Sequence, residues 1–254
     1  MMRTVAVIPV RMGSERLPGK VMASIEGQPL LGHLLDRVQR CTALDDVVVA
    51  TSTNSENDCI ETYCNQQQIS VFRGDEEDVL DRLLQALLWC GADTGVLIFG
   101  DGPLIDRQII SKAVSFFYAN PGYDLVSNDL LTTWPPGMEV EVFKVEVLAD
   151  AAGRCQDPQI REHGTLFIRQ HTEIYRLYNL VAPEELNRPD LSFEVDVAED
   201  VQVIEALLKR FQYEPDVPLN ELIHYMDKHP HLSALTSKVE RRWKRHRQTN
   251  EAQQ

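Results

Sequence analysis

Short β-branched runs alternate with helical apolar patterns through the first 120 residues of the chain. Residues 5–10 predict a buried strand, because this apolar run is brief and ends at a loop with two glycines and a proline. Leucines at helical spacing then predict a helix over residues 29–41. The same reading predicts strands at residues 46–51, 70–72 and 95–99 and helices at residues 55–67 and 79–88. Such alternation implies an α/β fold of three layers, with helices on both faces of a mainly parallel mixed sheet and ligands at the carboxyl ends of its strands.

The pattern changes after residue 118, where strands are predicted at residues 123–127, 138–143, 173–180 and 191–197. A proline-rich break and two helical segments separate them, so residues 120–190 are predicted to be an insertion that faces the substrate. An amphipathic helix is predicted at residues 201–211. We therefore expect one domain over residues 1–213, followed by a helical C-terminal appendage and polar tail over residues 214–254.

Composition narrows the class of protein. The formal net charge of -14 disfavours a nucleic-acid partner, because phosphate backbones attract basic surfaces. No apolar run approaches the roughly 20 residues of a membrane span. The five cysteines contain no C-x-x-C pair, and their odd number fits a reducing compartment better than a disulfide framework. Because the N-terminus also lacks the apolar region of a signal peptide, we expect a cytoplasmic protein.

The segment after the first strand, residues 11–20, reads R-M-G-S-E-R-L-P-G-K and carries three basic residues. Gly13 and Gly19 let backbone amides approach an anion, and Ser14 adds a hydroxyl donor. A P-loop is excluded, because it has four residues between its glycines and Ser or Thr after its lysine, whereas this segment has five and a valine. The segment therefore predicts a triphosphate site of another kind.

The pattern R-x-x-S-x-R-L-P-G-K behind an N-terminal strand resembles the signature of the cytidylyltransferases that activate acidic sugars, such as CMP-Kdo synthetase and CMP-sialic acid synthetase. Over residues 5–208 the chain is most similar to the branch named after spore coat polysaccharide biosynthesis protein F. The other matching stretches are V-V-A-T-S-T at 48–53, V-F-R-G-D at 71–75, D-V-L-D-R at 78–82, G-D-x-P-L-I-D at 100–106, E-V-E-V-F at 139–143, R-E-H at 161–163 and V-D at 195–196. The resemblance implies the Rossmann-like nucleotidyltransferase fold of the nucleotide-diphospho-sugar transferases, with residues 1–213 as the nucleotidyltransferase domain.

The resemblance also implies a nucleotide site between the loop after the first strand and residues 73–82. The predicted nucleotide-binding residues are Arg11, Gly13, Ser14, Lys20, Thr51, Ser52, Arg73, Asp78 and Arg82. Arg11 and Lys20 would hold the β- and γ-phosphates, and Arg16 would neutralise the departing pyrophosphate. Together with Asp101, these three residues are the predicted catalytic set.

A divalent cation is expected, because negative charge builds up on several phosphate oxygens when a sugar hydroxyl attacks the α-phosphate. Magnesium prefers one or two carboxylates together with phosphate oxygens and water. Asp101 follows the strand at residues 95–99 and is the first predicted Mg²⁺ ligand, and the resemblance places Asp196 across the site as the second. An isolated aspartate is more often a turn residue or a helix cap, which is our interpretation of Asp200. The general base stays open between His163, Asp196 and none.

Two pairs of residues are candidates for binding the sugar. Glu139 and Glu141 are two apart in a predicted strand, so both point to one face, where they either bind hydroxyl groups or meet solvent. The resemblance places Arg161 and His163 beside the sugar, where Arg161 would pair with a substrate carboxylate.

The chain departs from the family pattern on this sugar side. Gly102 stands where relatives have cysteine, Pro136 where they have aspartate, and Ser192 where they often have arginine. Residues 162–167 read E-H-G-T-L-F where relatives often have E-H-V-T-P-Y. The nucleotide side matches the family, whereas the sugar side is altered.

The predicted activity is Mg²⁺-dependent transfer of CMP from CTP to a sugar, an acidic one by resemblance, with release of pyrophosphate. Two alternatives stay open: a transferase for another nucleotide or a neutral sugar, and a non-catalytic scaffold that retains the nucleotide pocket. The resemblance implies a homodimer. The basic stretch of residues 238–247 is either a solvated helix end or a docking segment for a membrane surface, a nucleic acid or a partner subunit.

Overall fold

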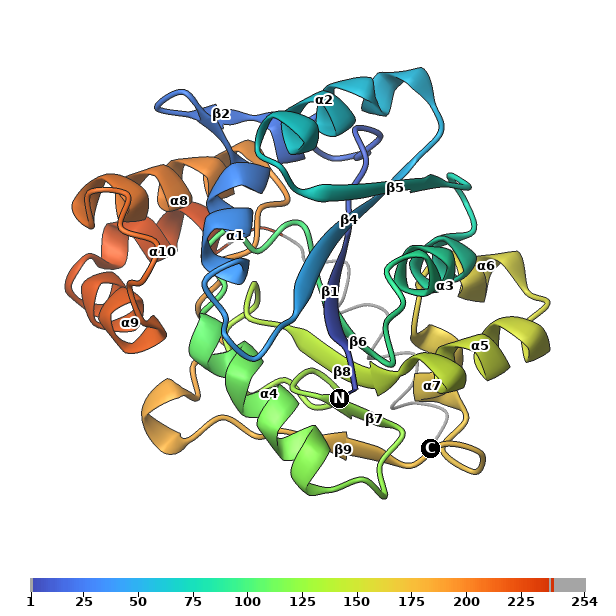
Figure 1. Cartoon of the computed structure of the whole chain (residues 1–254). Coiled ribbons are helices and arrows are strands. Elements are labelled where there is room, and N and C mark those ends of the chain that lie inside the picture. Colours follow the sequence, from blue (N-terminus) through green and yellow to red (C-terminus); the bar gives the residue numbers. More distant parts are fainter. Residues whose placement is uncertain (1, 238, 240–254) are drawn as a thin grey trace.

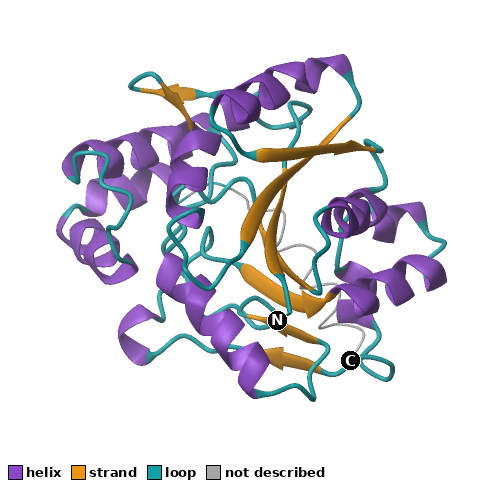
Figure 2. Ribbon diagram, viewed as in Figure 1, coloured by secondary structure: helices purple, strands orange, loops and turns teal. Residues whose placement is uncertain are grey.

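A seven-stranded mixed sheet lies at the centre of the computed structural model, which describes residues 2–237 and 239 (Figures 1 and 2). Its strand order is β5-β4-β1-β6-β8-β7-β9, and β8 runs antiparallel to both of its neighbours while the other pairs are parallel. The strands are β1 (Thr4–Pro9), β4 (Asp46–Ser52), β5 (Ser70–Gly74), β6 (Thr94–Ile98), β7 (Leu125–Ser127), β8 (Val140–Lys144) and β9 (Leu177–Asn179), and β2 (Ser24–Ile25) and β3 (Gln28–Pro29) form a separate hairpin. The prediction of a mainly parallel mixed sheet is confirmed.

Helices cover both faces of this sheet, which makes three layers (Figure 1). The helices are α1 (Leu30–Val38), α2 (Asp58–Gln66), α3 (Val79–Trp89), α4 (Arg107–Ala119), α5 (Val145–Arg154), α6 (Pro158–Arg161), α7 (Leu166–Gln170), α8 (Ala198–Arg210), α9 (Leu219–Lys228) and α10 (Pro230–Thr236), with 3-10 turns η1 (Lys20–Met22), η2 (Ser55–Asn57) and η3 (Glu184–Leu186). One hydrophobic cluster includes residues of α1, α2, α4 and α8–α10, and the other includes residues of α3, α5 and α7. Within the described residues, no helix is both long and apolar enough to span a bilayer.

Strand β1 shows why the apolar runs of the sequence were informative. Val5 and Val7 belong to the cluster beneath α3, whereas Ala6 and Ile8 belong to the cluster beneath α1, and all four are fully buried. Successive side chains of a strand point to opposite faces, so a strand covered on both faces is apolar without interruption.

The predicted strand at residues 191–197 is wrong. Leu191, Phe193 and Val195 alternate with polar residues in the sequence, as in a strand, but Glu194 and Asp196 are buried as well and the segment belongs to no sheet. The amide of Phe193 donates to the carbonyl of Pro136 at 2.7 Å, and the amide of Val195 donates to the carbonyl of Asp101 at 2.8 Å. The segment therefore crosses the loops at the end of the sheet, where its amides find isolated carbonyls instead of a neighbouring strand.

Strand β9 is shorter than the predicted run of residues 173–180. The carbonyl of His171 accepts from the amides of Ile174 at 3.0 Å and Tyr175 at 2.9 Å, so the first part of the run is a turn. Only the last part is left to pair with β7.

Helices α9 and α10 pack into the same hydrophobic cluster as the sheet. Leu219, Leu222 and Met226 of α9 and Leu232 of α10 are buried there. The described part of residues 214–254 is thus helical and attached to the core, while the division at residue 213 stays a prediction. The basic stretch of residues 238–247 lies outside the described residues, apart from Val239.

Asp106 links this C-terminal segment to the sheet. It is buried, and its Oδ1 caps α4 by accepting from the amide of Gln108 at 2.8 Å. Its Oδ2 accepts from the amide of Leu219 at 2.8 Å, at the start of α9.

We expect Asp106→Ala to lower the free energy of unfolding by about 2–4 kcal/mol, because it removes a helix cap and leaves a buried amide unpaired. Urea unfolding at pH 7 measures this loss. Asp157→Ala is the matched control, since Asp157 is an exposed cap whose side chain accepts from Gln159 of its own helix. A loss no larger than that of the control, about 1 kcal/mol, would contradict the role of Asp106.

Candidate functional site

The loops after β1 and β6 meet at the carboxyl edge of the parallel strands. Gly100 makes this approach possible, because a Cβ atom there would lie 2.3 Å from Cγ1 of Val10 and 3.0 Å from the carbonyl oxygen of Pro9. Gly19 has a left-handed φ of 72° and donates its amide to the carbonyl of Met12 at 2.9 Å, which closes the first loop. Lys20 follows directly, at the start of η1.

The ammonium group of Lys20 lies between the two aspartates predicted to bind Mg²⁺. Its Nζ is 3.3 Å from Oδ2 of Asp101, 3.2 Å from Oδ1 of Asp196 and 2.6 Å from the carbonyl oxygen of Val195. Arg16 approaches the other oxygen of Asp196 at 2.5 Å. Burial lowers the pKa of Lys20, but the charges of Asp101 and Asp196 outweigh this effect and leave the pKa raised. Four residues predicted from distant parts of the sequence thus form one ion-pair cluster.

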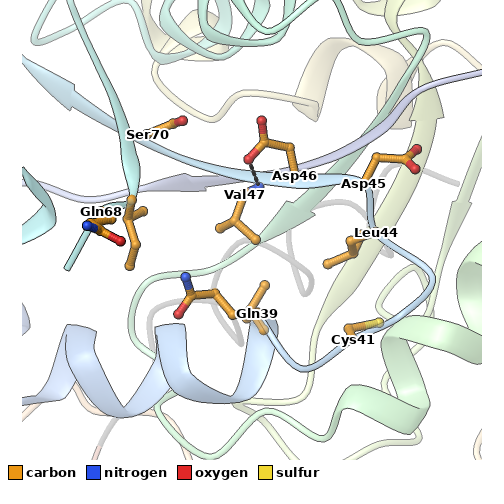
Figure 3. Close-up of a pocket in the computed structure, with 10 residues that line it drawn as sticks. Gln39, Cys41, Leu44, Asp45, Asp46, Val47, Gln68 and Ser70 are labelled. Atoms are coloured by element: carbon orange, nitrogen blue, oxygen red, sulfur yellow. Dashed lines mark hydrogen bonds between the residues drawn. The ribbon is translucent and has the colours of Figure 1, made fainter.

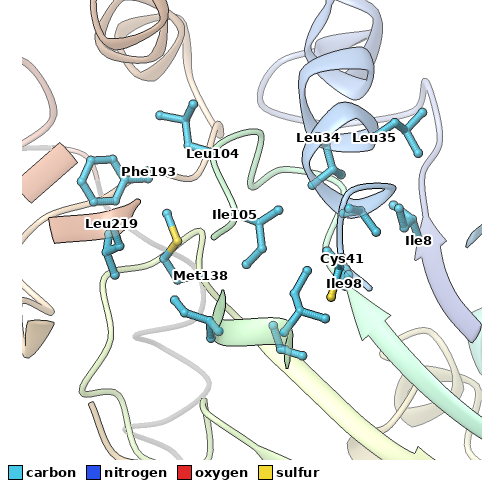
Figure 4. Close-up of a cluster of buried hydrophobic side chains, with 14 of the residues drawn as sticks. Ile8, Leu34, Leu35, Cys41, Ile98, Leu104, Ile105, Met138, Phe193 and Leu219 are labelled. Atoms are coloured by element: carbon cyan, nitrogen blue, oxygen red, sulfur yellow. The ribbon is translucent and has the colours of Figure 1, made fainter. Parts of the chain in front are cut away.

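Hydrophobic side chains hold the two aspartates in place. Leu104 and Ile105, just after Asp101, and Phe193, just before Asp196, enter the same buried cluster (Figure 4). The amide of Val195 donates to the carbonyl of Asp101, which ties the two segments directly. The carboxylates are therefore positioned by buried neighbours on both loops.

The carboxylates of Asp101 and Asp196 fit a divalent cation. Both lie within 3.3 Å of one positive atom, so they converge on a single point. No group of three or more Asp, Glu, His or Cys residues in the described chain is placed to hold a metal ion by itself. Two carboxylates, with the remaining ligands from phosphate and water, are the arrangement that magnesium accepts.

Arg11 belongs to a second cluster, centred on Glu76, which the sequence did not single out. Nη1 of Arg11 is 3.0 Å from Oε1 of Glu76, and Nη2 is 3.3 Å from Oε1 of Glu162. The other oxygen of Glu76 accepts from Ser52 Oγ and from Nδ2 of Asn54 at 3.1 Å. Burial raises the pKa of Glu76, but hydrogen bonds from Ser52 and Arg11 outweigh it and lower the pKa.

Asn57 is the second residue that sequence reasoning missed. It is fully buried, and its Oδ1 accepts from the amide of Met12 at 2.8 Å while its Nδ2 donates to Ser52 Oγ at 2.8 Å. Asn57 thus joins the loop after β1 to the end of β4. An asparagine before a helix ordinarily signals a cap, so nothing in the sequence distinguished this role.

Two predicted nucleotide-binding arginines are engaged within the protein. Arg73 donates to the carbonyls of Ser52 and Asn54, both at 2.9 Å, and pairs with Glu61 at 2.6 Å. Arg82 is buried and donates to backbone carbonyls at residues 75 and 76. Both guanidinium groups therefore hold backbone carbonyls at the end of β4 and in the loops after β4 and β5. Direct contact of either arginine with a nucleotide stays a prediction.

The remaining residues that were predicted to bind the nucleotide differ in their exposure to solvent. Gly13 is exposed and Ser14 is half-buried in the first loop, whereas Thr51 and Ser52 are fully buried at the end of β4. Asp78 caps α3 by accepting from the amide of Asp81 at 3.0 Å. Their contact with a nucleotide stays a prediction.

The two glutamates predicted to bind the sugar have different surroundings. Oε2 of Glu139 accepts from the amide of Gly137 at 2.8 Å. Glu141 is fully buried in β8, where its oxygens accept from Thr165 and, at 3.1 Å, from Arg169. The carboxylate of Glu141 holds the segment around α7 against the sheet, and its contact with a sugar stays a prediction.

Arg161 and Asp78, predicted for the sugar and the nucleotide, pair with each other. Nε and Nη2 of Arg161 lie 2.8 and 2.7 Å from Oδ2 of Asp78, and Nη1 donates to the carbonyls of Ala152 and Cys155. The guanidinium is thus engaged on all sides by the protein, which argues against its predicted pairing with a substrate carboxylate. His163 is exposed just after α6.

The departures from the family pattern coincide with a tight stack of loops. A Cβ atom at Gly102 would lie 2.5 Å from the carbonyl oxygen of Gly137, and one at Gly137, whose φ is 95°, would lie 2.5 Å from the carbonyl carbon of Phe193. The carbonyl of Pro136 accepts from the amide of Phe193. Gly102 therefore allows the proline-containing loop to pack directly beside Asp101.

A pocket elsewhere on the protein is unrelated to this site. It has a volume of about 180 Å³ and is lined by residues near the end of α1 and the starts of β4 and β5, among them Asp46 and Ser70 (Figure 3). These are the amino ends of parallel strands, at the opposite edge of the sheet from Lys20.

Several known proteins are similar to this chain in sequence or in fold. A cytidylyltransferase family model matches residues 5–225. The spore coat polysaccharide biosynthesis protein SpsF of Bacillus subtilis is 33% identical over 88% of this chain and 94% of its own length. A 3-deoxy-manno-octulosonate cytidylyltransferase of Trichlorobacter lovleyi is 35% identical over 48% of this chain and 47% of its own length. The solved structure of a cytidylyltransferase from Leptospira borgpetersenii is similar with a TM-score of 0.86 and 29% identity, covering 91% of this chain and 97% of that one.

The environment of Glu139 generates a prediction about pH. Burial raises its pKa well above the ordinary value, and the charges of Asp129, Glu194 and Asp101 raise it further. The folded protein therefore retains a proton at Glu139 that the unfolded chain releases from about pH 4 upward, so this residue lowers stability as the pH rises. We expect Glu139→Gln to leave the free energy of unfolding unchanged below about pH 4 and to raise it increasingly toward pH 7.

Urea unfolding between pH 4 and pH 8 tests this expectation. Glu221→Gln, on the exposed side of α9, is the control and should give a difference that does not vary with pH. A pH-independent difference for Glu139→Gln as well would show that its carboxyl is not perturbed.

Proposed function

The chain belongs to the cytidylyltransferase family, and from this premise we propose that it transfers CMP from CTP to a hydroxyl group of an acidic sugar and releases pyrophosphate. The observation that carries the proposal is the convergence of Lys20, Arg16, Asp101 and Asp196 at the carboxyl edge of the sheet. Cationic groups for a triphosphate and acidic groups for its metal ion lie within one cluster there.

In this proposal the basic residues act on the phosphates by charge. Lys20 and Arg11 hold the β- and γ-phosphates, and Arg16 neutralises the pyrophosphate as it leaves. Gly13 and Ser14 contribute amide and hydroxyl donors from the first loop. No covalent intermediate with the protein is required.

Asp101 and Asp196 would hold Mg²⁺. When bound, the ion supplies positive charge to the phosphate oxygens that become more negative during transfer. Asp196 also pairs with Arg16, so the same carboxylate orients one of the phosphate-binding side chains.

The sugar would bind on the side of Glu139 and His163. The names of the relatives support an acidic sugar for a surface polysaccharide, since one is a 3-deoxy-manno-octulosonate cytidylyltransferase and another serves spore coat polysaccharide synthesis. A neutral sugar is the second candidate, because Glu139 lies within reach of the charges of Asp129, Glu194 and Asp101. Negative charge on this side disfavours a substrate carboxylate.

We also propose a cytoplasmic homodimer. The family resemblance supports the dimer. The five cysteines are all free thiols in the structure, which fits the reducing environment of the cytoplasm.

A pyrophosphate-release assay with each nucleoside triphosphate, Mg²⁺ and a panel of acidic and neutral sugars tests the proposal. Release that requires CTP and an acidic sugar supports it, whereas release with a neutral sugar supports the second candidate. CTP binding without turnover on any sugar would favour a non-catalytic scaffold.

We expect Asp101→Asn to lower kcat at least about 100-fold, because one of two metal-binding carboxylates is lost. Asp227→Asn is the control, since Asp227 pairs with Arg188 on the surface of α9. Steady-state kinetics with a saturating sugar measure both. Near-normal turnover of Asp101→Asn would refute the assignment of the site.

We expect Asn57→Ala to raise the KM for CTP about tenfold while kcat changes less, because the partly buried amide of Met12 loses its acceptor and the loop of residues 11–20 loosens. Asn65→Ala removes an exposed asparagine of α2, the helix that follows Asn57, and is the control. An effect confined to kcat would contradict a role in positioning the nucleotide loop.

A further inference from the structure

The protein's own ammonium group and the proposed metal ion require the same two carboxylates. We propose that Lys20 occupies the cation position between Asp101 and Asp196 until the phosphates of the nucleotide draw it away, so that the divalent ion binds only together with the nucleotide. This inference rests on the proposed function, because it assumes that the site takes a nucleotide and a metal ion.

The first argument is geometric. Nζ of Lys20 lies within 3.3 Å of one oxygen from each aspartate, which leaves no separate point on which both carboxylates converge. The side chains of Lys20 and Asp196 are only 13% and 12% exposed. The small space lined by Lys20, Val21, Leu30, Gly100, Asp101, Pro103 and Val195 has no room for a water molecule. This space beside Lys20 is therefore too small for a hydrated divalent ion.

The second argument concerns charge. The two carboxylates are balanced by Lys20 and Arg16, so the cluster of four side chains has no net charge. A divalent ion placed beside this cluster would be repelled by Lys20 and Arg16 together about as strongly as the two carboxylates attract it. A triphosphate reverses the balance, because its negative charges attract Lys20 and its oxygens supply further metal ligands.

The third argument concerns the side chain that must move. Lysine carries its charge on a flexible four-carbon stem, so its ammonium group can exchange oxygen partners without a change in the backbone. The carbonyl of Val195, at 2.6 Å, is a third acceptor that holds Lys20 in its place. Asp101 and Asp196, in contrast, are fixed by the buried residues that flank them. The lysine is therefore the mobile member of the cluster, and the carboxylates are the fixed ones.

Direct measurement of Mn²⁺ binding by electron paramagnetic resonance, without nucleotide or turnover, tests the inference. Wild type should bind Mn²⁺ no better than Asp101→Asn. Lys20→Met, which retains the length of the side chain without its charge, should bind one Mn²⁺ per chain at least about tenfold more tightly than wild type. Addition of CTP should give wild type the same site.

Two further variants localise the effect. Lys20→Met combined with Asp101→Asn should lose the gained Mn²⁺. Lys228→Met removes the same charge from the exposed surface of α9 and should bind like wild type, which excludes an effect of net charge alone.

Mn²⁺ binding to wild type without CTP, at the affinity of Lys20→Met and lost in Asp101→Asn, would overturn the inference while leaving the proposed function intact. Failure of Mn²⁺ to bind to folded Lys20→Met would also overturn it. If Lys20→Met does not fold by circular dichroism, the wild-type measurements with and without CTP decide. Failure of CTP itself to bind would refute the proposed function instead.

Discussion

The contact of Lys20 with Asp101 and Asp196 joins the three segments on which the site depends. The lysine comes from the loop after β1, the first aspartate from the loop after β6, and the second from the segment just before α8. These segments have no sheet hydrogen bonds with one another at this edge. Charge attraction within a partly buried cluster, supported by the amide of Val195 on the carbonyl of Asp101, holds them together.

The cluster around Glu76 is its counterpart among the residues predicted to bind the nucleotide. There the carboxylate of Glu76 accepts hydrogen bonds from Arg11, Ser52 and Asn54. At Lys20, in contrast, the ammonium group donates to the oxygens of Asp101 and Asp196. The segment around α6 joins the two sides of the site, because Glu162 pairs with Arg11 and Arg161 pairs with Asp78. Arg161, which was predicted to contact the sugar, therefore supports Asp78, which was predicted to contact the nucleotide.

The fold was predictable where burial on both faces left a strong pattern. Strands β1, β4 and β6 are apolar runs between helical stripes, and the structure has them within one or two residues of the predicted bounds. The error at residues 191–197 has the same origin. Phe193 and Val195 alternate with polar residues as in a strand, but Glu194 and Asp196 are buried as well, and the amides of this segment bond to loop carbonyls instead of a neighbouring strand.

By itself the sequence determined the alternating α/β order and the cationic loop of residues 11–20, because these depend on local periodicity and on which side chains can carry charge, while the family resemblance singled out Asp101 and Asp196. The tertiary structure alone decided which charged side chains form ion pairs with each other. It placed Glu76 against Arg11, paired Glu141 with Arg169 and set Lys20 between the two aspartates. Such pairings join residues far apart in the chain, and a charged side chain has the same local signature whatever partner the fold brings to it.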